Sequence, residues 1–442
     1  MVPVRAVFFF ALFAVAAAAA EPPKHPPDLE AIAVAAGSAP AEFHADALLR
    51  LAESGKVADP AWKREMIEEA FAVTASARTP VPVRSVRAGR TASGPALDRL
   101  SLQVRAVNLM RSIDGRKARA MFAEVSKPSP RELECTDATW DDVSAWYSAA
   151  AHLVGTFSPA ERRRQDHLNF AVSAIASVVS VTEVAPAQAM LTVPDWRPDE
   201  TDFLGAKFAA VIEQLNPGNR TFSAAEAEAR QAIDKLVASG YDGTLMRGAW
   251  SRLVDRQQSV EKCPAVSQVT AALGGMQMAS TPPSDPQASR LASHWMNLMF
   301  GTKQQSLTDA EKNTQAWRDS LAAYLTEIDE LKADTPEGEL EVYQMKTEAL
   351  GGLLIAVPPG ADRDRIRARY VETLAASPVE AQNPGRWLTA VKQLLDSAAA
   401  APAEIRKLFD AFESTGNPAL VLYARLERTL PQTLFKSPST VP

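Results

Sequence analysis

Apolar residues recur at three- and four-residue intervals over most of the chain, and the pattern is clearest between Leu97 and Val125. One apolar stripe there consists of Leu97, Leu100, Val104 and Val107, and a second consists of Leu102, Ala106, Leu109 and Ile113. A helix that is apolar on two sides packs between neighbours rather than on a single core. Asp114 and Gly115 interrupt the pattern, which resumes from Ala118. The stretch therefore predicts two helices joined by a tight turn, an αα-hairpin.

Similar units recur along the chain, and start signals mark several of them. Capping boxes, in which Ser or Thr is followed three residues later by Glu, begin at Ser158, Ser223 and Thr308. The first predicts a helix that runs toward Val181, and Trp140 to Val154 is also helical by spacing. Strand-type alternation is almost absent. We therefore expect an all-α fold: an array of antiparallel helical hairpins, either solenoid-like or a multi-helical bundle.

The first 20 residues have the features of a secretory signal peptide. Arg5 supplies a positive n-region, an apolar run follows, and Ala18 and Ala20 form a small-residue cleavage site. The run is shorter than the roughly 20 residues that a spanning helix needs, which favours cleavage over an uncleaved anchor. We expect a periplasmic or secreted protein with no transmembrane segment after cleavage.

Proline-rich stretches divide the remaining chain. Residues 21–40 contain four prolines among their first seven residues and predict a tether. Residues 280–288 predict a linker between two helical regions. The expected organisation is an N-terminal helical region at 41–279, a C-terminal one at 289–432 and a tail at 433–442. Single cores stop growing near about 250–300 residues, so a chain of 442 residues fits two subdomains or one extended array.

The charge balance excludes one class of partner. The formal net charge is −6, and loss of Arg5 with the signal peptide makes it −7. This mild acidity argues against binding to nucleic acid, which requires a basic surface.

The predicted hairpins resemble the helical-hairpin repeat class in a general way, including tetratricopeptide (TPR) and HEAT arrays. The fixed 34-residue TPR period with its Trp, Leu-Gly, Tyr and Pro positions is missing. Two short segments resemble segments of secreted bacterial all-helical proteins of unknown function: residues 46–52, Asp-Ala-Leu-Leu-Arg-Leu-Ala, and residues 105–107, Arg-Ala-Val. That resemblance implies export and helices, and it carries no catalytic residue.

Motifs for common chemistry are missing from the sequence. None of the five histidines has metal-ligand spacing with a Glu partner, and there is no phosphate-binding glycine loop, dinucleotide fingerprint or Gly-x-Ser-x-Gly elbow. The sequence therefore predicts no catalytic residue, no metal ligand and no cofactor.

One cluster combines aromatic and acidic residues: Trp140, Asp141, Asp142, Trp146 and Tyr147. Aromatic rings beside carboxylates are typical of a sugar-cleaving cleft with acid and base groups. The structural alternative places Trp140 and Tyr147 on one buried helical face, with the two aspartates in the first turn, where they complement the helix dipole. We favour the structural role and keep all five residues as cleft candidates.

The function that these features favour is non-enzymatic. We expect an exported helical scaffold that presents a groove to a protein or peptide partner in the cell envelope. The alternative is a secreted carbohydrate-active enzyme of the α/α-toroid type. A toroid should gather aromatic and acidic residues in one central cleft, whereas a hairpin array should bury its tryptophans singly between helices.

The two cysteines, Cys135 and Cys263, are predicted to form a disulfide. Export places the chain in an oxidising compartment, where two and only two cysteines are usually paired. Both lie at loop-like positions, since Cys135 follows Pro128 and Pro130 and Cys263 precedes Pro264. Both are also outside the predicted apolar stripes, whereas inert thiols are usually buried.

Overall fold

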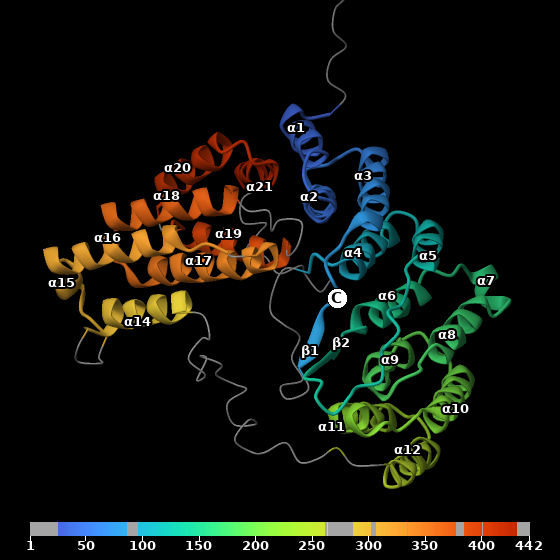
Figure 1. Cartoon of the computed structure of the whole chain (residues 1–442). Coiled ribbons are helices and arrows are strands. Elements are labelled where there is room, and N and C mark those ends of the chain that lie inside the picture. The colour runs from blue at the N-terminus through green and yellow to red at the C-terminus, as the bar shows by residue number, and fades with distance from the viewer. Residues whose placement is uncertain are drawn as a thin grey trace, which may run out of the picture.

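The computed structural model describes residues 25–85, 96–260, 263, 286–301, 306–333, 335–376, 384–399 and 401–430 (Figure 1). Helices dominate this part of the chain, as the apolar spacing predicts. The predicted signal peptide, residues 1–20, and the predicted tail, residues 433–442, lie outside the described residues. None of the described helices is long and apolar enough to cross a membrane.

The N-terminal half of the chain forms a curved, two-layered array (Figure 1). Its helices are α1 (Pro27–Ala36), α2 (Ala41–Glu53), α3 (Pro60–Val73), α4 (Arg99–Arg111), α5 (Gly115–Ala123), α6 (Ser144–Val154), α7 (Pro159–Arg163), α8 (Asp166–Ala176), α9 (Val184–Leu191), α10 (Pro198–Gln214), α11 (Asn219–Ala238) and α12 (Gly243–Gln257). Short 3₁₀ helices lie at Thr74–Ser76 and Val181–Glu183. One layer runs through α2, α4, α6, α9 and α11, each packed on the next, and the second includes α8, α10 and α12.

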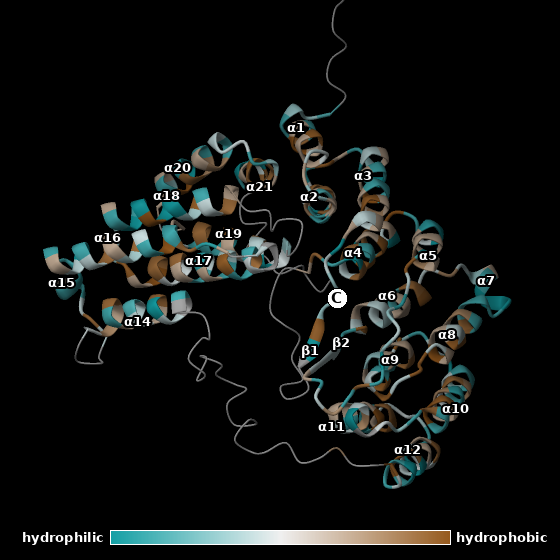
Figure 2. Cartoon of the chain, in the orientation of Figure 1, coloured by the Kyte–Doolittle hydropathy of each residue, from teal (hydrophilic) through white to brown (hydrophobic). Residues whose placement is uncertain are grey.

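The predicted hairpin at 97–125 is confirmed as α4 and α5. Asp98 caps α4 by accepting from the Ser101 backbone N–H at 2.9 Å, and Asp114 caps α5 by accepting from Lys117 at 2.9 Å. Both predicted stripes contribute to the core, because α4 contacts α2, α3, α5 and α6. Figure 2 shows hydrophobic residues gathered where helices face one another.

The C-terminal half is a second group of packed helices (Figure 1). It comprises α14 (Pro286–Phe300), α15 (Asp309–Lys312), α16 (Gln315–Glu330), α17 (Pro336–Ala356), α18 (Ala361–Ala375), α19 (Pro384–Asp396), α20 (Pro402–Ser414) and α21 (Pro418–Thr429). Its helices pack mainly on their neighbours in sequence, α14 on α16, α17 on α18 and α20 on α21. The fold is therefore an all-α array of hairpins.

The predicted tether at 21–40 is wrong over residues 27–36, which form α1. Pro27 occupies the first helical turn, where a missing N–H costs no hydrogen bond. Leu29, Ile32 and Ala36 are buried, because α1 packs against α2 and against α21 from the other end of the chain. The predicted linker at 280–288 is likewise helical from Pro286 onward.

A small antiparallel ribbon interrupts the helices. It pairs β1 (Val83–Ser85) with β2 (Thr139–Asp141), and Arg84 lies opposite Trp140. The predicted helix at 140–154 therefore begins only at Ser144. Local spacing could not show this, because β2 exists through pairing with a segment more than 50 residues earlier.

Two other helix boundaries differ from expectation. The helix predicted from Ser158 toward Val181 is divided into α7 and α8 by Gln165, whose backbone is left-handed with φ 62°. The box at Ser223 does not start a helix, because α11 already begins at Asn219 and the Ser223 hydroxyl donates to the Arg220 carbonyl. The boxes at Ser158 and Thr308 are confirmed.

The disulfide between Cys135 and Cys263 is present, with a Cα–Cα distance of 5.4 Å. It joins the segment before β2 to the segment that follows α12, 128 positions apart. The pairing predicted from the cysteine count is confirmed.

Candidate functional site

Trp140, the first of the sequence-predicted cleft candidates, belongs to the ribbon and not to a helix. Its side chain is buried, and the Arg84 guanidinium lies 5.7 Å from its ring centroid. Arg84 also forms an ion pair with Glu228 of α11 at 2.7 Å. The predicted helical face shared by Trp140 and Tyr147 is therefore wrong, and it is Arg84 that links the ribbon to α11.

Asp141 and Asp142 lie at the junction between β2 and α6. The Asp142 side chain accepts from the Ser144 backbone N–H at 2.9 Å, and its own N–H donates to the Pro82 carbonyl at 2.7 Å. The aspartates thus precede the first turn of α6, where a carboxylate stabilises the exposed N–H groups.

Trp146 and Tyr147 are both on α6 and point into the packed interior. The Trp146 Nε1–H donates to the Val125 carbonyl at 3.3 Å, and Tyr147 is fully buried. The five candidates therefore lie in three places: Trp140 and Asp141 in β2, Asp142 just before α6, and Trp146 and Tyr147 within α6. The structure does not bring them together in one cleft.

Tyr147 belongs to a buried polar cluster that the sequence analysis missed. Its hydroxyl donates to Glu183 Oε1 at 3.0 Å, and Lys127 forms an ion pair with the same carboxylate. The second Glu183 oxygen accepts from the backbone N–H groups of Val179 and Ser180. Burial and the neighbouring Glu183 raise the pKa of Tyr147 well above its usual value, so this hydroxyl stays protonated and has a structural role.

The eight tryptophans are distributed along the whole array. Each has its own neighbours: Trp62 with His25, Trp140 with Arg84, Trp146 with Phe122, Trp196 with His167, Trp250 with Phe222, Trp295 with Tyr324, Trp317 with the Leu298 carbonyl, and Trp387 with Phe43. This dispersal is the arrangement expected of a hairpin array.

A groove with mixed lining lies between α14 and α16. Its volume is about 470 Å³, within the range of about 300–1,000 Å³ that ligand pockets occupy. Its polar lining is Gln287, Arg290, His294, Thr326, Glu327 and Glu330, and its apolar lining is Ala323 and Leu331. The groove therefore offers hydrogen-bond donors, acceptors and both charge signs beside an apolar surface.

His294 stands in this groove and connects the two helices. Its Nδ1 lies 2.9 Å from Glu327 Oε2, and its Nε2 lies 3.3 Å from Ser320 Oγ. The ring also meets the Tyr324 ring edge-on at a centroid distance of 5.1 Å. A carboxylate, an imidazole and a hydroxyl are thus aligned in series, the order in which hydrolases hold a base and a nucleophile.

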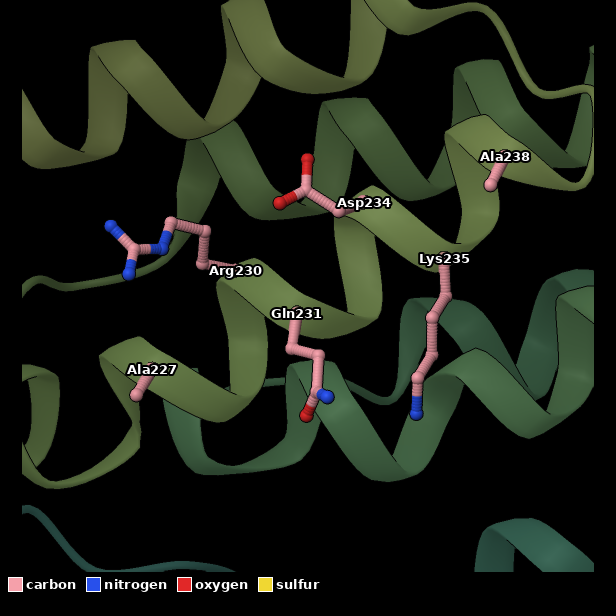
Figure 3. A pocket seen from close by; sticks show the side chains of 6 residues that line it. All are labelled: Ala227, Arg230, Gln231, Asp234, Lys235 and Ala238. Atoms are coloured by element: carbon pink, nitrogen blue, oxygen red, sulfur yellow. The ribbon is translucent and has the colours of Figure 1, made fainter.

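A second hollow, on α11, differs in kind. Ala227, Arg230, Gln231, Asp234, Lys235 and Ala238 line its volume of about 420 Å³. All six come from one helix, and in Figure 3 the four polar side chains spread in different directions instead of converging. This hollow is an open surface on one side of a single helix.

Among the described residues, no group of three or more His, Cys, Asp and Glu side chains is arranged to hold a metal ion. Two other histidines each contact one glutamate. His44 meets Glu69 at 3.1 Å, and the buried His167 meets Glu200 at 3.0 Å.

Comparison with known proteins finds no family model, no curated protein and no solved structure that matches this chain.

The sequence patterns give no signal for Ser320 or for its partners His294 and Glu327, which line the groove. Ser320 and Glu327 are seven residues apart on α16, a spacing of two turns that places them on one face. His294 has no metal-ligand spacing with a Glu partner in the sequence. What assembles the three residues is the packing of α14 on α16, for which the spacing of single residues gives no signal.

Proposed function

We propose that this protein is an exported helical scaffold that binds a protein or peptide partner in the cell envelope, and that the partner binds in the groove between α14 and α16. One observation carries the proposal: the groove combines an apolar surface with side chains that donate and accept hydrogen bonds. A peptide backbone requires this combination, since each residue presents one N–H and one C=O group. The dispersed tryptophans further support a scaffold over a toroidal enzyme.

Site-specific photo-crosslinking tests the proposal. Ala323 in the groove and Ala227 in the α11 hollow are both exposed helical alanines, so they form a matched pair. A photoreactive amino acid at position 323 should capture one partner from an envelope fraction, and position 227 should not. The purified partner should then bind the wild-type protein, and Ala323→Trp should lower its affinity at least tenfold while Ala227→Trp leaves it unchanged.

Equal capture from both positions, or equal affinity of the two tryptophan variants, contradicts the groove as the binding site. The carbohydrate-active alternative has its own readout. If the protein cleaves a glycan and the double change Asp141→Asn with Asp142→Asn abolishes that activity, the enzyme replaces the scaffold.

A further inference from the structure

The Ser320 hydroxyl has a contact that sets it apart from neighbouring hydroxyls on the same helices. Ser293 on α14 and Thr326 on α16 each donate to the carbonyl four residues earlier, at 2.9 and 3.0 Å. This is the usual arrangement for a hydroxyl inside a helix. Ser320 Oγ instead lies 3.3 Å from His294 Nε2, on the neighbouring helix. Its contact is therefore with an imidazole on another helix.

Glu327 determines which nitrogen of His294 carries the proton. An ionised carboxylate only accepts hydrogen bonds, so its contact of 2.9 Å with Nδ1 requires the proton to be on Nδ1. In the neutral ring the Nε2 lone pair then faces the Ser320 hydroxyl. This is the tautomer that a general base needs in order to take a proton from serine.

Ser320 is also reachable from solvent, since its side chain is only partly buried. The backbone N–H of Ser320 lies inside α16 and is used by the helix, so it cannot stabilise a developing oxyanion. Asn297 offers another donor. It is exposed and lies three residues beyond His294, on the same face of α14. The Trp317 Nε1–H donates to the Leu298 carbonyl at 3.0 Å, so this end of α14 lies beside the start of α16, toward Ser320.

From this geometry we infer that Ser320 is a nucleophile activated by His294 and Glu327, and that it takes acyl groups from small activated esters. Ser320 Oγ bonds to the carbonyl carbon of the ester as its proton passes to His294 Nε2. The bond from that carbon to the leaving oxygen then breaks, and the leaving group takes the proton. Water then adds to the acyl carbon and gives a proton to His294 Nε2; the bond from that carbon to Ser320 Oγ breaks, Oγ takes the proton from His294, and a carboxylic acid is released. This activity needs no protein partner and does not depend on the proposed scaffold function.

Covalent labelling of the full chain with a fluorophosphonate, followed by peptide mass spectrometry, tests the inference. Ser320 should be labelled in the folded wild-type protein, and Ser320→Ala should abolish that label. Because a positioned general base contributes about 10²- to 10⁴-fold, His294→Asn should slow labelling at least 100-fold. Ser293→Ala is the matched control, since it removes a neighbouring hydroxyl that has no histidine contact, and the Ser320 label should persist at the wild-type rate.

A second measurement keeps the test independent of how well the variants fold. Release of p-nitrophenolate from p-nitrophenyl acetate should show a burst of one equivalent per chain in the wild-type protein. Asn297→Ala changes only an exposed residue and should reduce the burst rate at least tenfold. A folded wild-type protein whose Ser320 remains unlabelled overturns the inference. So does an unchanged labelling rate in a His294→Asn variant whose circular dichroism spectrum matches the parent.

Discussion

At the scale of single residues, the buried carboxylate of Asp46 holds together side chains from three helices. It is buried on α2 and accepts from Arg50 Nε and Arg105 Nη1, both at 2.7 Å. The Tyr423 hydroxyl of α21 donates to it at 2.8 Å. Burial by itself would raise the pKa of Asp46, but the two guanidinium groups and the hydrogen bonds prevail and lower it to about 2. Asp46 therefore links both ends of the chain through its ionised form.

This environment predicts acid sensitivity. The pKa of Asp46 falls from 3.8 to about 2 on folding, so its contribution is fully present above pH 4 and is lost as the pH falls toward 2. The lost contribution is about 2 kcal/mol, at 1.36 kcal/mol per unit. Urea unfolding at a series of pH values should show this loss in the wild-type protein and not in Asp46→Asn.

Asp410→Asn is the control for that experiment. Asp410 pairs with Arg428 on the surface, where the Asp410 side chain is 71% exposed and solvent screens the pair. This variant should keep the acid sensitivity of the parent. If Asp46→Asn shows the same pH dependence as the wild-type protein, the network does not stabilise the ionised carboxylate.

At the scale of elements, the junction of α7 and α8 shows how one residue sets a helix boundary. Gln165 has a left-handed backbone, which costs roughly 1–2 kcal/mol in a residue with a Cβ atom. The conformation ends α7 and allows α8 to begin at Asp166 in a new direction. α8 then brings the buried His167 to Glu200 of α10.

Glycine substitution tests this account. Gln165→Gly should leave the free energy of unfolding unchanged or raise it by up to about 1 kcal/mol, because relief of strain outweighs the added freedom of the unfolded chain. Gln165→Val should lower it by about 1–2 kcal/mol. Asn169→Gly, at an exposed position inside α8, is the control and should lower it by about 0.3–0.5 kcal/mol. If both glycine variants lose the same stability, the backbone of Gln165 is not strained.

At the scale of the whole molecule, long-range contacts join the N-terminal and C-terminal halves of the described chain. α21 packs on α1 and α2, and Tyr423 meets Phe43 and Trp387 in an aromatic cluster. The disulfide is a covalent constraint on the N-terminal half. It bonds Cys263, which follows α12, to Cys135, which precedes β2. The packing of α21 on α1 and the disulfide between Cys135 and Cys263 therefore restrain different parts of the chain.

The disulfide should contribute substantially to stability. A loop of 128 positions corresponds to about 5 kcal/mol in the chain-entropy model, and strain or residual unfolded structure lowers that figure. Cys135→Ser and Cys263→Ser should each lower the free energy of unfolding by the same amount, and the double variant by no more. Calorimetry or urea unfolding measures this directly.

Thiol titration completes the test. The denatured, unreduced wild-type protein should have no free thiol, and each single variant should have one. Reduction should destabilise the wild-type protein and leave the double variant unchanged. Two free thiols per wild-type chain would contradict the pairing.

The sequence by itself was sufficient where the determining interactions are local. Apolar spacing and the interruption at Asp114 and Gly115 predict the hairpin α4/α5, because a helix satisfies its backbone hydrogen bonds from within. The disulfide also followed from the chain alone, since two cysteines allow a single intramolecular pairing. The prediction of a helix start at Ser223 was wrong. The capping motif lies inside the longer helix α11, whose packing is more favourable than a start at Ser223.

What only the tertiary structure decided depends on contacts between distant segments. Trp140 lies in a strand and not in the expected helix because β2 pairs with β1. For the same reason the five cleft candidates do not share one helix. Pro27 begins a helix instead of a tether because α21 covers α1. Ser320, His294 and Glu327 have no common signature in the sequence, because their alignment results from the packing of α14 against α16. Local periodicity determines which residues face inward, but only the packed fold determines which of them meet.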